Sequence, residues 1–361
     1  MKRKLTNIEI NKQKWNKELN SILENKLPFF CMDFFVGIAM RTSLLTQINY
    51  ARDLYIFFDF LVKKVNHFYG KDILSLTLDD LNALESKDLE YYLKYLNFYV
   101  INGIERTNDS KGKARKLSAV RSMLSYFYKN NKIQENVGVK VSSPKIPEKP
   151  IVRLEPIEIE KILDLSEAKE KFSSVFQDKY NAHTSKRDYA IIALLLGTGI
   201  RVSECTNLNI FDVDFKNNAF NVIRKGGNSV ILYFSDEVKE ALVEYLPERQ
   251  NRLLLADRIN EENAFFISLQ NTRISQRAVE NIVKKYSKLV NPLKNVSPHK
   301  LRSTFGTEMY KKTKDIYVVA EVLGHKDVNT TKKHYAAISE EIKMNAVKNV
   351  SLRNNDKNNS T

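Results

Sequence analysis

Cysteine is scarce in this sequence. The 361 residues include only Cys31 and Cys205, which are too far apart in the chain to match a metal-binding or dithiol spacing. Two reduced cysteines are typical of a cytosolic protein, because disulfides are rare in that compartment. A disulfide-stapled scaffold and a cysteine-based zinc site are therefore excluded, and we expect both thiols to be free.

Long uncharged apolar runs are also lacking. The basic N-terminal stretch MKRKLTNIEINKQKWNKELN has no apolar core of the kind found in a signal peptide. No later stretch is both long enough and free enough of charge to cross a bilayer. We therefore expect a cytoplasmic protein with no membrane partner.

Acidic residues are outnumbered in this chain. It has 43 Asp and Glu against 58 Lys and Arg, which gives a formal net charge of +15 at pH 7. A positive field of this size favours a polyanionic partner, either nucleic acid or an anionic membrane surface. A soluble basic protein without such a partner would carry the same charge, so charge alone leaves that alternative open.

Proline is sparse but unevenly placed. Three of the eight prolines lie within seven positions, in the stretch VSSPKIPEKPIV at residues 141–152. Proline interrupts both helices and sheet ladders, so this stretch predicts an extended linker. A chain of this length also exceeds what one hydrophobic core usually spans, which favours two domains.

Hydrophobic periodicity predicts the elements on either side of this linker. Before it, apolar residues recur at helical spacing from Leu44, Leu78 and Ala114, so we expect a small helical bundle. After it, EPIEIEKILDL and KRDYAIIALLLG predict helices, residues 210–234 predict a β-rich patch, and helices follow to about Val347. The fold class is therefore expected to be mainly α with a small β-sheet.

Residues 111–132 are basic without a single acidic residue, around an apolar stripe at helical spacing. A solvated helix face normally mixes charges, so a face of one sign favours contact with phosphates over a plain solvated surface. The candidate DNA contacts on this helix are Lys111, Lys113, Arg115, Lys116 and Arg121.

Two short motifs follow the linker. In LLLGTGIRVSEC a glycine turn ends an apolar helix, and Arg201 follows it with Glu204 three residues later. The predicted hairpin AFNVIRKGGNSVILYF places Lys225 in its turn. Taken singly, each is weak, because Arg201 and Lys225 are also consistent with exposed surface charges.

Two further motifs lie nearer the C-terminus. In SPHKLRSTFGTEMY, His299 and Arg302 are three residues apart and fall on one face of a helix. In LGHKDVNTTKKHY, His325 precedes Tyr335 by ten residues. Taken alone, Tyr335 is also consistent with a packed aromatic, since the chain has 17 tyrosines.

The order of these motifs is specific. From about Met40 to Ile342 the chain resembles the tyrosine site-specific recombinases, which carry an arginine, a lysine on a β-turn, a His-x-x-Arg box, a Gly-His pair and a terminal tyrosine in this order. The resemblance implies a helical core-binding domain and a catalytic domain that clamp DNA. The catalytic residues that it implies are Arg201, Lys225, His299, Arg302, His325 and the nucleophile Tyr335, with Glu204 as an accessory acid.

The resemblance implies a chemistry that suits these residue types. Two guanidiniums hold the scissile phosphate while Tyr335 attacks it and forms a 3′-phosphotyrosyl link. His299 would accept the tyrosine proton, Lys225 would protonate the departing 5′-oxygen, and His325 would donate a hydrogen bond to the phosphate. Glu204 would orient His299 or an arginine. The resemblance implies no cofactor, neither metal nor ATP.

The resemblance also predicts domain boundaries. These are a basic N-terminal segment at 1–25, a helical core-binding domain at 26–142, the linker at 143–151, the catalytic domain at 152–338, and a C-terminal helix with a disordered tail at 339–361. The short N-terminal segment favours an Xer-like recombinase that resolves chromosome or plasmid dimers. An integrase or excisionase of a phage or conjugative element, a non-catalytic DNA-binding relative and a type IB topoisomerase remain alternatives.

The predicted C-terminal helix has an apolar face that must be buried. Docking in its own domain is one solution, and docking on a neighbouring subunit is the one that the resemblance implies. We expect a monomer in free solution and a homotetramer on double-stranded DNA with short inverted-repeat sites, with or without an accessory protein.

Overall fold

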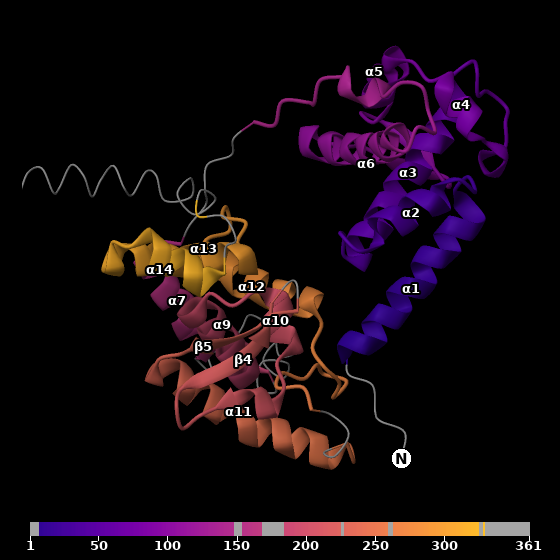
Figure 1. Ribbon diagram of the computed structural model, residues 1–361. Coiled ribbons are helices and arrows are strands. Elements are labelled where there is room, and N and C mark those ends of the chain that lie inside the picture. The colour runs from indigo at the N-terminus through magenta and orange to yellow at the C-terminus, as the bar shows by residue number, and fades with distance from the viewer. Residues whose placement is uncertain are drawn as a thin grey trace, which may run out of the picture. The chain divides into compact units, whose positions relative to one another are not determined.

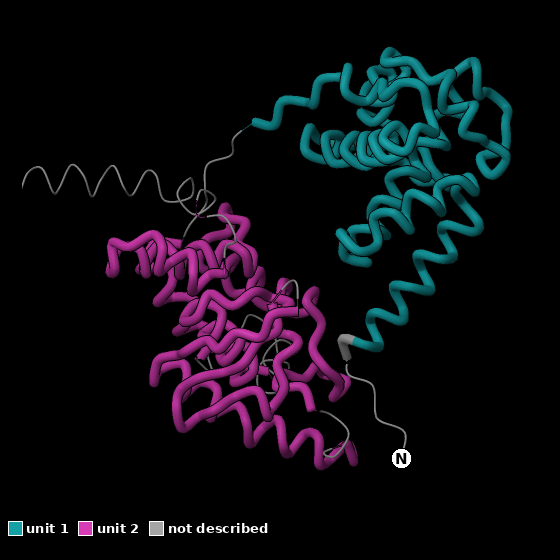
Figure 2. Tube along the Cα trace, viewed as in Figure 1, with its two compact units in different colours: residues 1–149 teal, residues 150–361 magenta. Residues whose placement is uncertain are grey.

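The computed structural model describes residues 7–147, 154–167, 184–224, 227–258, 263–324 and 328. The chain forms two compact units, residues 1–149 and 150–361, shown in different colours in Figure 2. Each unit has its own hydrophobic core. The division falls inside the proline-rich stretch for which we predicted a linker.

Unit 1 is helical, with one small hairpin (Figure 1). Its elements are α1 (Asn7–Lys26), α2 (Cys31–Ala39), α3 (Leu44–Lys64), α4 (Leu78–Asn82), α5 (Ser86–Tyr95), β1 (Tyr99–Ile101), β2 (Ile104–Arg106) and α6 (Ser110–Lys129), with short 3-10 turns at Ile73–Ser75 and Val137–Val139. The helices predicted from Leu44 and Ala114 are confirmed as α3 and α6.

The stretch from Leu78 forms two helices instead of one. Thr77 caps α4 through its side chain, and the Asp88 carboxylate accepts a hydrogen bond of 2.9 Å from the backbone N–H of Glu85 to start α5. The β1–β2 hairpin was not predicted. Its turn is Asn102–Gly103, both with positive φ, the dipeptide that a tight hairpin turn favours.

The core of unit 1 lies between α3 and the helices around it. Side chains on one face of α3 are fully buried and pack against α1 and α6. Phe57, Phe58 and Phe127 are at most 1% exposed, and each forms an edge-to-face pair with another buried aromatic ring. Such rings bury large apolar areas, so these rings contribute to the stability of the unit.

Unit 2 combines helices with a three-stranded antiparallel sheet, as predicted for the segment after the linker. Its elements are α7 (Pro156–Glu167), α9 (Ser185–Thr198), α10 (Val202–Asn207), a 3-10 turn at Ile210–Asp212, β3 (Val213–Asp214), β4 (Ala219–Ile223), β5 (Ser229–Tyr233), α11 (Asp236–Leu255), α12 (Gln276–Val290), α13 (Pro298–Thr313) and α14 (Ile316–Leu323).

Helix α9 is the centre of unit 2. Its segment 190–195 is at most 4% exposed, because α7, α11 and α13 pack around it (Figure 1). A helix that is apolar on every side can lie only in such a position. The helix therefore provides a rigid base for the residues at its C-terminal end.

The expected hairpin is present in unit 2. Strands β4 and β5 pair with Phe220 opposite Leu232, and both of these side chains face the core. Backbone hydrogen bonds continue past the strands, since the Arg224 N–H donates to the Asn228 carbonyl at 2.8 Å. Lys225, at the turn, lies outside the described residues.

Cys31 and Cys205 are free and fully buried, each in a different unit. Burial raises the pKa of the Cys205 thiol to about 12 and that of Cys31 well above its ordinary value. The prediction of unpaired thiols is confirmed.

In the described part of the chain, none of the helices has a stretch apolar enough to span a membrane.

Candidate active site

Arg201 lies at the N-terminus of α10, directly after the turn that ends α9. Gly199 makes this turn with φ +61°, and a Cβ atom there would overlap the ring of Phe305. Glycine is therefore required for both the left-handed conformation and the close approach. The turn redirects the chain so that Arg201 begins a new helix at the edge of the core.

Glu204 holds Arg201 in place. Its carboxylate accepts hydrogen bonds from the Arg201 backbone N–H at 3.1 Å and from Arg201 Nη1 at 2.8 Å. The carboxylate is 4% exposed, whereas the arginine side chain is one-third exposed at 33%. Glu204 therefore contacts an arginine, and its buried charge fixes the orientation of a guanidinium that reaches the surface.

Arg302 extends from α13 to the same place. Its side chain is buried, and its two terminal nitrogens donate hydrogen bonds to the carbonyls of Gly199 and Leu323. The first of these carbonyls belongs to the turn that precedes Arg201. A guanidinium satisfies such carbonyls with fixed, planar geometry, which a lysine ammonium does not reproduce.

The C-terminal end of α14 joins the two arginines. This helix begins after Asp315, whose side chain caps it, and ends at Gly324 with φ +61°. Arg302 donates to the Leu323 carbonyl, and Arg201 Nη2 donates to the Gly324 carbonyl at 3.0 Å. Two guanidiniums that are a hundred residues apart in the chain thus converge on consecutive carbonyls.

A third arginine, which the sequence analysis did not single out, lies at the same helix end. Arg224 Nη1 donates to the Glu321 carbonyl at 3.2 Å and Nη2 to the Val322 carbonyl at 2.6 Å. The last carbonyls of a helix lack partners within it and carry partial negative charge, which favours cations there. Nothing in the local sequence distinguishes Arg224 from an ordinary residue of a hairpin turn.

Arg201, Arg224 and Arg302 form an arginine cluster at the end of α14, which concentrates positive charge. Burial lowers the pKa of the Arg224 guanidinium, the positive charge of Arg201 lowers it further, and Glu204 opposes both effects. Of these three guanidiniums, the one of Arg201 is paired with the Glu204 carboxylate. A site with excess charge of this sign is suited to an anion with several oxygens, such as a phosphodiester.

The remaining predicted residues stand next to this cluster in the chain. His299 is exposed, in the first turn of α13, one turn before Arg302 on the same helix. Lys225 follows Arg224, and His325 follows Gly324. Lys225, His325 and Tyr335 lie outside the described residues, so their roles stay predictions.

The basic helix of unit 1 requires a correction. Lys116 is 5% exposed, and its ammonium pairs with Asp53 at 3.1 Å, so it is a core residue and does not face a phosphate. Arg121 donates to the carbonyl of Gly138 at 2.8 Å and to Ser143 Oγ at 2.7 Å, so it braces the chain after α6. The partners of both side chains lie outside residues 111–132, so the charge of that stretch does not reveal these interactions.

The other three predicted phosphate contacts on this helix are more accessible. Lys111 is exposed, Lys113 donates to Asn97 Oδ1 at 2.5 Å, and Arg115, itself exposed, forms a bidentate pair with Asp53. Of these, Lys111 has the least protein contact. Lys111, Lys113 and Arg115 therefore remain the predicted phosphate contacts on α6.

We expect Lys116→Ala to lower the free energy of unfolding by ~2–4 kcal/mol, because it leaves the buried Asp53 carboxylate with one cation instead of two. Lys111→Ala, as the matched control on the same helix, should change it by less than ~0.5 kcal/mol. Urea unfolding measures both. Equal and small effects in the two variants would contradict the core assignment of Lys116.

The same variant predicts a pH dependence. Burial raises the pKa of Asp53, although Lys116 and Arg115 both act to lower it. A carboxyl whose pKa is raised in the folded state favours folding more as the pH falls through that pKa. Removing Lys116 raises the pKa further, so the loss of stability relative to wild type should shrink as the pH falls from neutral through that raised pKa, because a protonated carboxyl no longer needs a cation.

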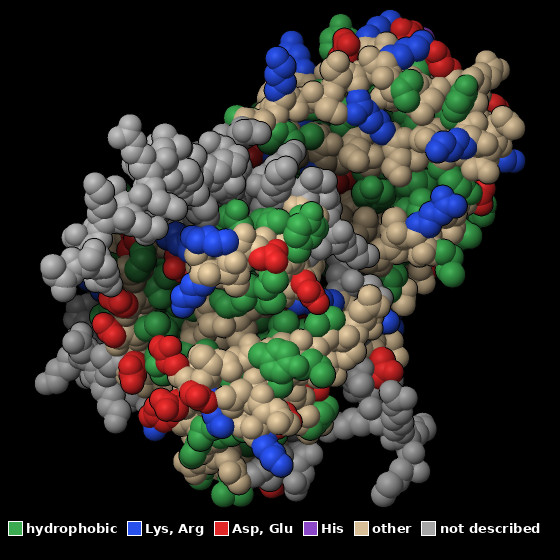
Figure 3. Space-filling model, turned by 60° about the vertical axis from the view of Figure 1, so that its left-hand side comes forward, with side chains coloured by type: hydrophobic (Ala, Val, Ile, Leu, Met, Phe, Trp, Pro, Cys, Tyr) green, Lys and Arg blue, Asp and Glu red, His purple; other side chains and the backbone are tan. Residues whose placement is uncertain are grey.

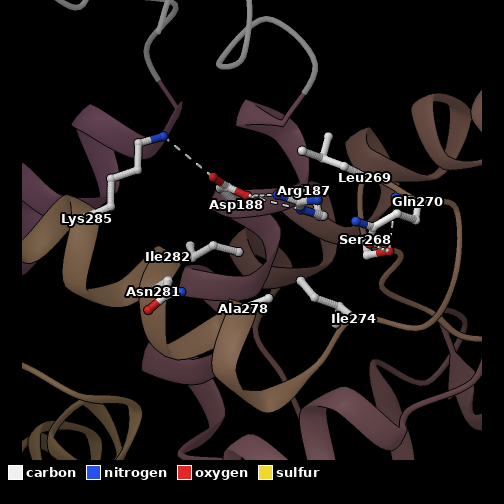
Figure 4. A pocket seen from close by; sticks show the side chains of 10 residues that line it. All are labelled: Arg187, Asp188, Ser268, Leu269, Gln270, Ile274, Ala278, Asn281, Ile282 and Lys285. Atoms are coloured by element: carbon white, nitrogen blue, oxygen red, sulfur yellow. Dashed lines mark hydrogen bonds and ion pairs between the residues drawn. The ribbon is translucent and has the colours of Figure 1, made fainter.

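Unit 2 also has a cavity of about 280 Å³ beside α9 and α12, and none of the residues that line it belongs to the arginine cluster. Figure 4 shows Asp188 between Arg187 and Lys285 at its wall. The Asp188 carboxylate accepts from Arg187 Nη2 at 2.7 Å and lies 3.8 Å from Lys285 Nζ. Burial raises the pKa of this carboxyl even so. Arg187 also donates to the Ile267 carbonyl, so this ion pair helps to join the start of α9 to the segment before α12.

Surface charge differs between parts of the molecule. On the face in Figure 3, Lys and Arg side chains are prominent over unit 1, while Asp and Glu side chains gather on one part of unit 2. Exposed carboxylates also occur along α11, at Asp236, Glu237, Glu240 and Glu244.

In the described ranges, no three His, Cys, Asp or Glu side chains come together in a way that could hold a metal ion.

The protein therefore combines a helical unit with a mixed unit in which three arginines from separate segments meet at one helix end, an arrangement suited to binding an anion. The sequence profile described as the Phage integrase family matches residues 153–341. The chain belongs to this family of tyrosine site-specific recombinases, enzymes that cut and rejoin DNA strands.

Curated relatives extend the match to both units. The chain is 34% identical over 323 residues to tyrosine recombinase XerC of Caldanaerobacter subterraneus subsp. tengcongensis, covering 87% of this chain and 85% of that protein. It is 30% identical over 345 residues to tyrosine recombinase XerS of Streptococcus uberis, covering 88% and 94%. The match therefore extends well beyond the catalytic motifs.

Solved structures share the fold. The XerH site-specific recombinase bound to a palindromic difH substrate aligns with a TM-score of 0.59 at 19% identity, covering 92% of each chain. The Tn1549 transposon integrase in complex with circular intermediate DNA aligns with a TM-score of 0.60 at 18% identity, covering 87% and 98%. The prediction of a mainly helical recombinase fold with a small sheet is confirmed.

Proposed function

We propose that this recombinase acts as an Xer-like enzyme, which resolves chromosome or plasmid dimers at paired sites in double-stranded DNA in the cytoplasm. The observation that carries the catalytic part of the proposal is the convergence of Arg201 and Arg302 on the end of α14. Relatives named XerC and XerS, matched over most of their length, support the biological role.

The arginine cluster explains how a phosphodiester would be held. Arg201 is one-third exposed and oriented by Glu204, so its fork can meet an incoming phosphate without rearranging. Arg302 bonds to the neighbouring Leu323 carbonyl and adds a second fixed charge. Negative charge grows on the non-bridging oxygens as the phosphorus is attacked, and preoriented guanidiniums stabilise that charge.

Strand cleavage then follows by transesterification. The Tyr335 oxygen bonds to phosphorus, the bond from phosphorus to the 5′-oxygen breaks, and the 3′-phosphate stays on the enzyme. His299 takes the phenol proton and Lys225 gives a proton to the departing oxygen, while His325 donates to the phosphate. Rejoining reverses these steps with a 5′-hydroxyl as nucleophile. One phosphoester replaces another, so the reaction draws on no ATP.

DNA contact is proposed for both units. Lys111, Lys113 and Arg115 would meet phosphates from unit 1, and the arginine cluster would do so from unit 2. The acidic part of unit 2 repels phosphates and would face away from the duplex (Figure 3). The XerH structure holds a palindromic substrate, which supports inverted-repeat sites for this chain as well.

Recombination between two sites breaks four strands, which calls for four tyrosines. We therefore propose a homotetramer on two paired duplexes, formed from monomers, with the segment after residue 338 docked on a neighbouring subunit. That segment lies outside the described residues. An accessory protein is compatible with this assembly.

A capture experiment tests the function. The protein is incubated with a randomised library of nicked duplexes in EDTA and without ATP, and DNA that becomes covalently attached is sequenced. We expect attached sequences to share an inverted repeat. An adduct that requires divalent metal, or no adduct at all, would contradict the proposal.

The captured site then separates the Xer-like role from that of an element integrase. Two identical copies are placed in direct repeat on a supercoiled plasmid. Excision of a circle from identical sites is expected of a dimer-resolving enzyme. Recombination only between two dissimilar sites would support the integrase instead.

A further inference from the structure

We propose that Arg224 is a positioning residue for strand cleavage, which ties the hairpin carrying Lys225 to the C-terminal end of α14. This inference rests on the proposed function, in which Lys225 protonates the leaving oxygen. Arg224 directly precedes Lys225 and bonds to the carbonyls of Glu321 and Val322 at 3.2 and 2.6 Å. One side chain thus links two segments that each precede a proposed catalytic residue.

The hairpin tip has little else to hold it. Its base is anchored by buried Phe220, Val222 and Leu232, but Ile223, next to Arg224, is 56% exposed. Among the tip residues that the structure describes, 223, 224 and 227–229, Arg224 alone hydrogen-bonds to a residue outside the hairpin. Without this guanidinium, no described side chain of the tip would hold it against Arg201 and Arg302.

The end of α14 is shaped to receive this side chain. Gly324 adopts φ +61°, and a Cβ atom at that position would overlap the Arg224 guanidinium. The glycine therefore ends the helix and at the same time leaves room for the arginine. Only a planar fork can bond to two successive carbonyls in this space, so a lysine would replace it incompletely.

Arg224 acts on Lys225 more than on His325. In its absence, Arg201 and Arg302 still bond to the Gly324 and Leu323 carbonyls, so the turn before His325 stays held. Among the described residues of the hairpin tip, no second side chain bonds to α14. Loss of Arg224 should therefore impair proton delivery to the 5′-oxygen while leaving phosphate binding and the attack by tyrosine in place.

A sulfur-substituted substrate isolates this step. Single-turnover cleavage is measured on a normal nicked site and on one with a 5′-bridging phosphorothiolate, whose thiolate leaves without a proton. Arg224→Ala should be slower by ~10–100-fold on the oxygen substrate, less than the ~10²–10⁴-fold that general acid catalysis contributes in full, because Lys225 is displaced and not removed. On the sulfur substrate it should come within about threefold of wild type, and Arg224→Lys should be intermediate on oxygen.

Arg252→Ala is the matched control. Arg252 also bridges to a backbone carbonyl in unit 2, at Ser268, and to Asn271, with distances of 2.8 and 2.9 Å. Its loss should leave cleavage of both substrates unchanged. Equal rates for Arg224→Ala and wild type on oxygen would overturn the inference alone, as would an equal defect on both substrates. Absence of an adduct with the wild-type protein would overturn the proposed function and this inference with it.

Discussion

Tyr335→Phe should bind its DNA site with wild-type affinity and form no covalent adduct. The change removes one hydroxyl, so the apolar ring and the charges that meet phosphates are retained. Without that oxygen, no phosphotyrosyl link can form, and cleavage should fall by at least about four orders of magnitude, as when other enzymes lose a nucleophile. Denaturing electrophoresis of the protein with labelled nicked DNA measures the adduct.

Tyr317→Phe provides the control for this experiment. Tyr317 lies at the start of α14, not far from Tyr335 in the chain, and is 70% exposed, so the change removes a hydroxyl without disturbing the core. This variant should form the adduct at the wild-type rate. An adduct that survives Tyr335→Phe would transfer the nucleophile to another tyrosine, which peptide mapping of the attached DNA would identify.

Arg302→Lys should slow the chemical step by ~10²–10³-fold, in the range seen when a preoriented donor to a transition-state anion is removed. Lysine keeps the charge but loses the fork that bonds to the Gly199 and Leu323 carbonyls and would meet the phosphate. DNA affinity should change little, because most affinity comes from the many other phosphate contacts. Single-turnover cleavage and binding titrations at fixed salt separate the two quantities.

Arg302 is also buried, so a loss of stability must be distinguished from a loss of catalysis. Arg249→Lys serves for this purpose. Arg249 is 8% exposed and donates to the Ala264 carbonyl at 2.9 Å, away from the arginine cluster. The Arg249→Lys variant should lower the thermal midpoint, as Arg302→Lys does, but leave the cleavage rate unchanged. A similar loss of cleavage in both variants would make Arg302 a structural residue.

Much of the local structure could be predicted from the sequence because its causes are local. Apolar spacing predicted α3, α6, α7 and α9, and the clustered prolines fall where the two units divide. The interaction of Arg201 with Glu204 spans three residues, a separation at which side chains meet at the start of a helix. The break between α4 and α5 and the Asn102–Gly103 turn also carry local signals, which the apolar periodicity alone did not reveal.

Tertiary structure decided the features that depend on distant partners. A lysine looks the same in sequence whether it faces solvent or a buried carboxylate, and only the packing of α6 on α3 put Lys116 beside Asp53. Likewise, the sequence determined which residue types stand in the recombinase order. That Arg201, Arg224 and Arg302 meet at one helix end was decided by the fold, since the carbonyls of α14 become their acceptors only once the helices pack together.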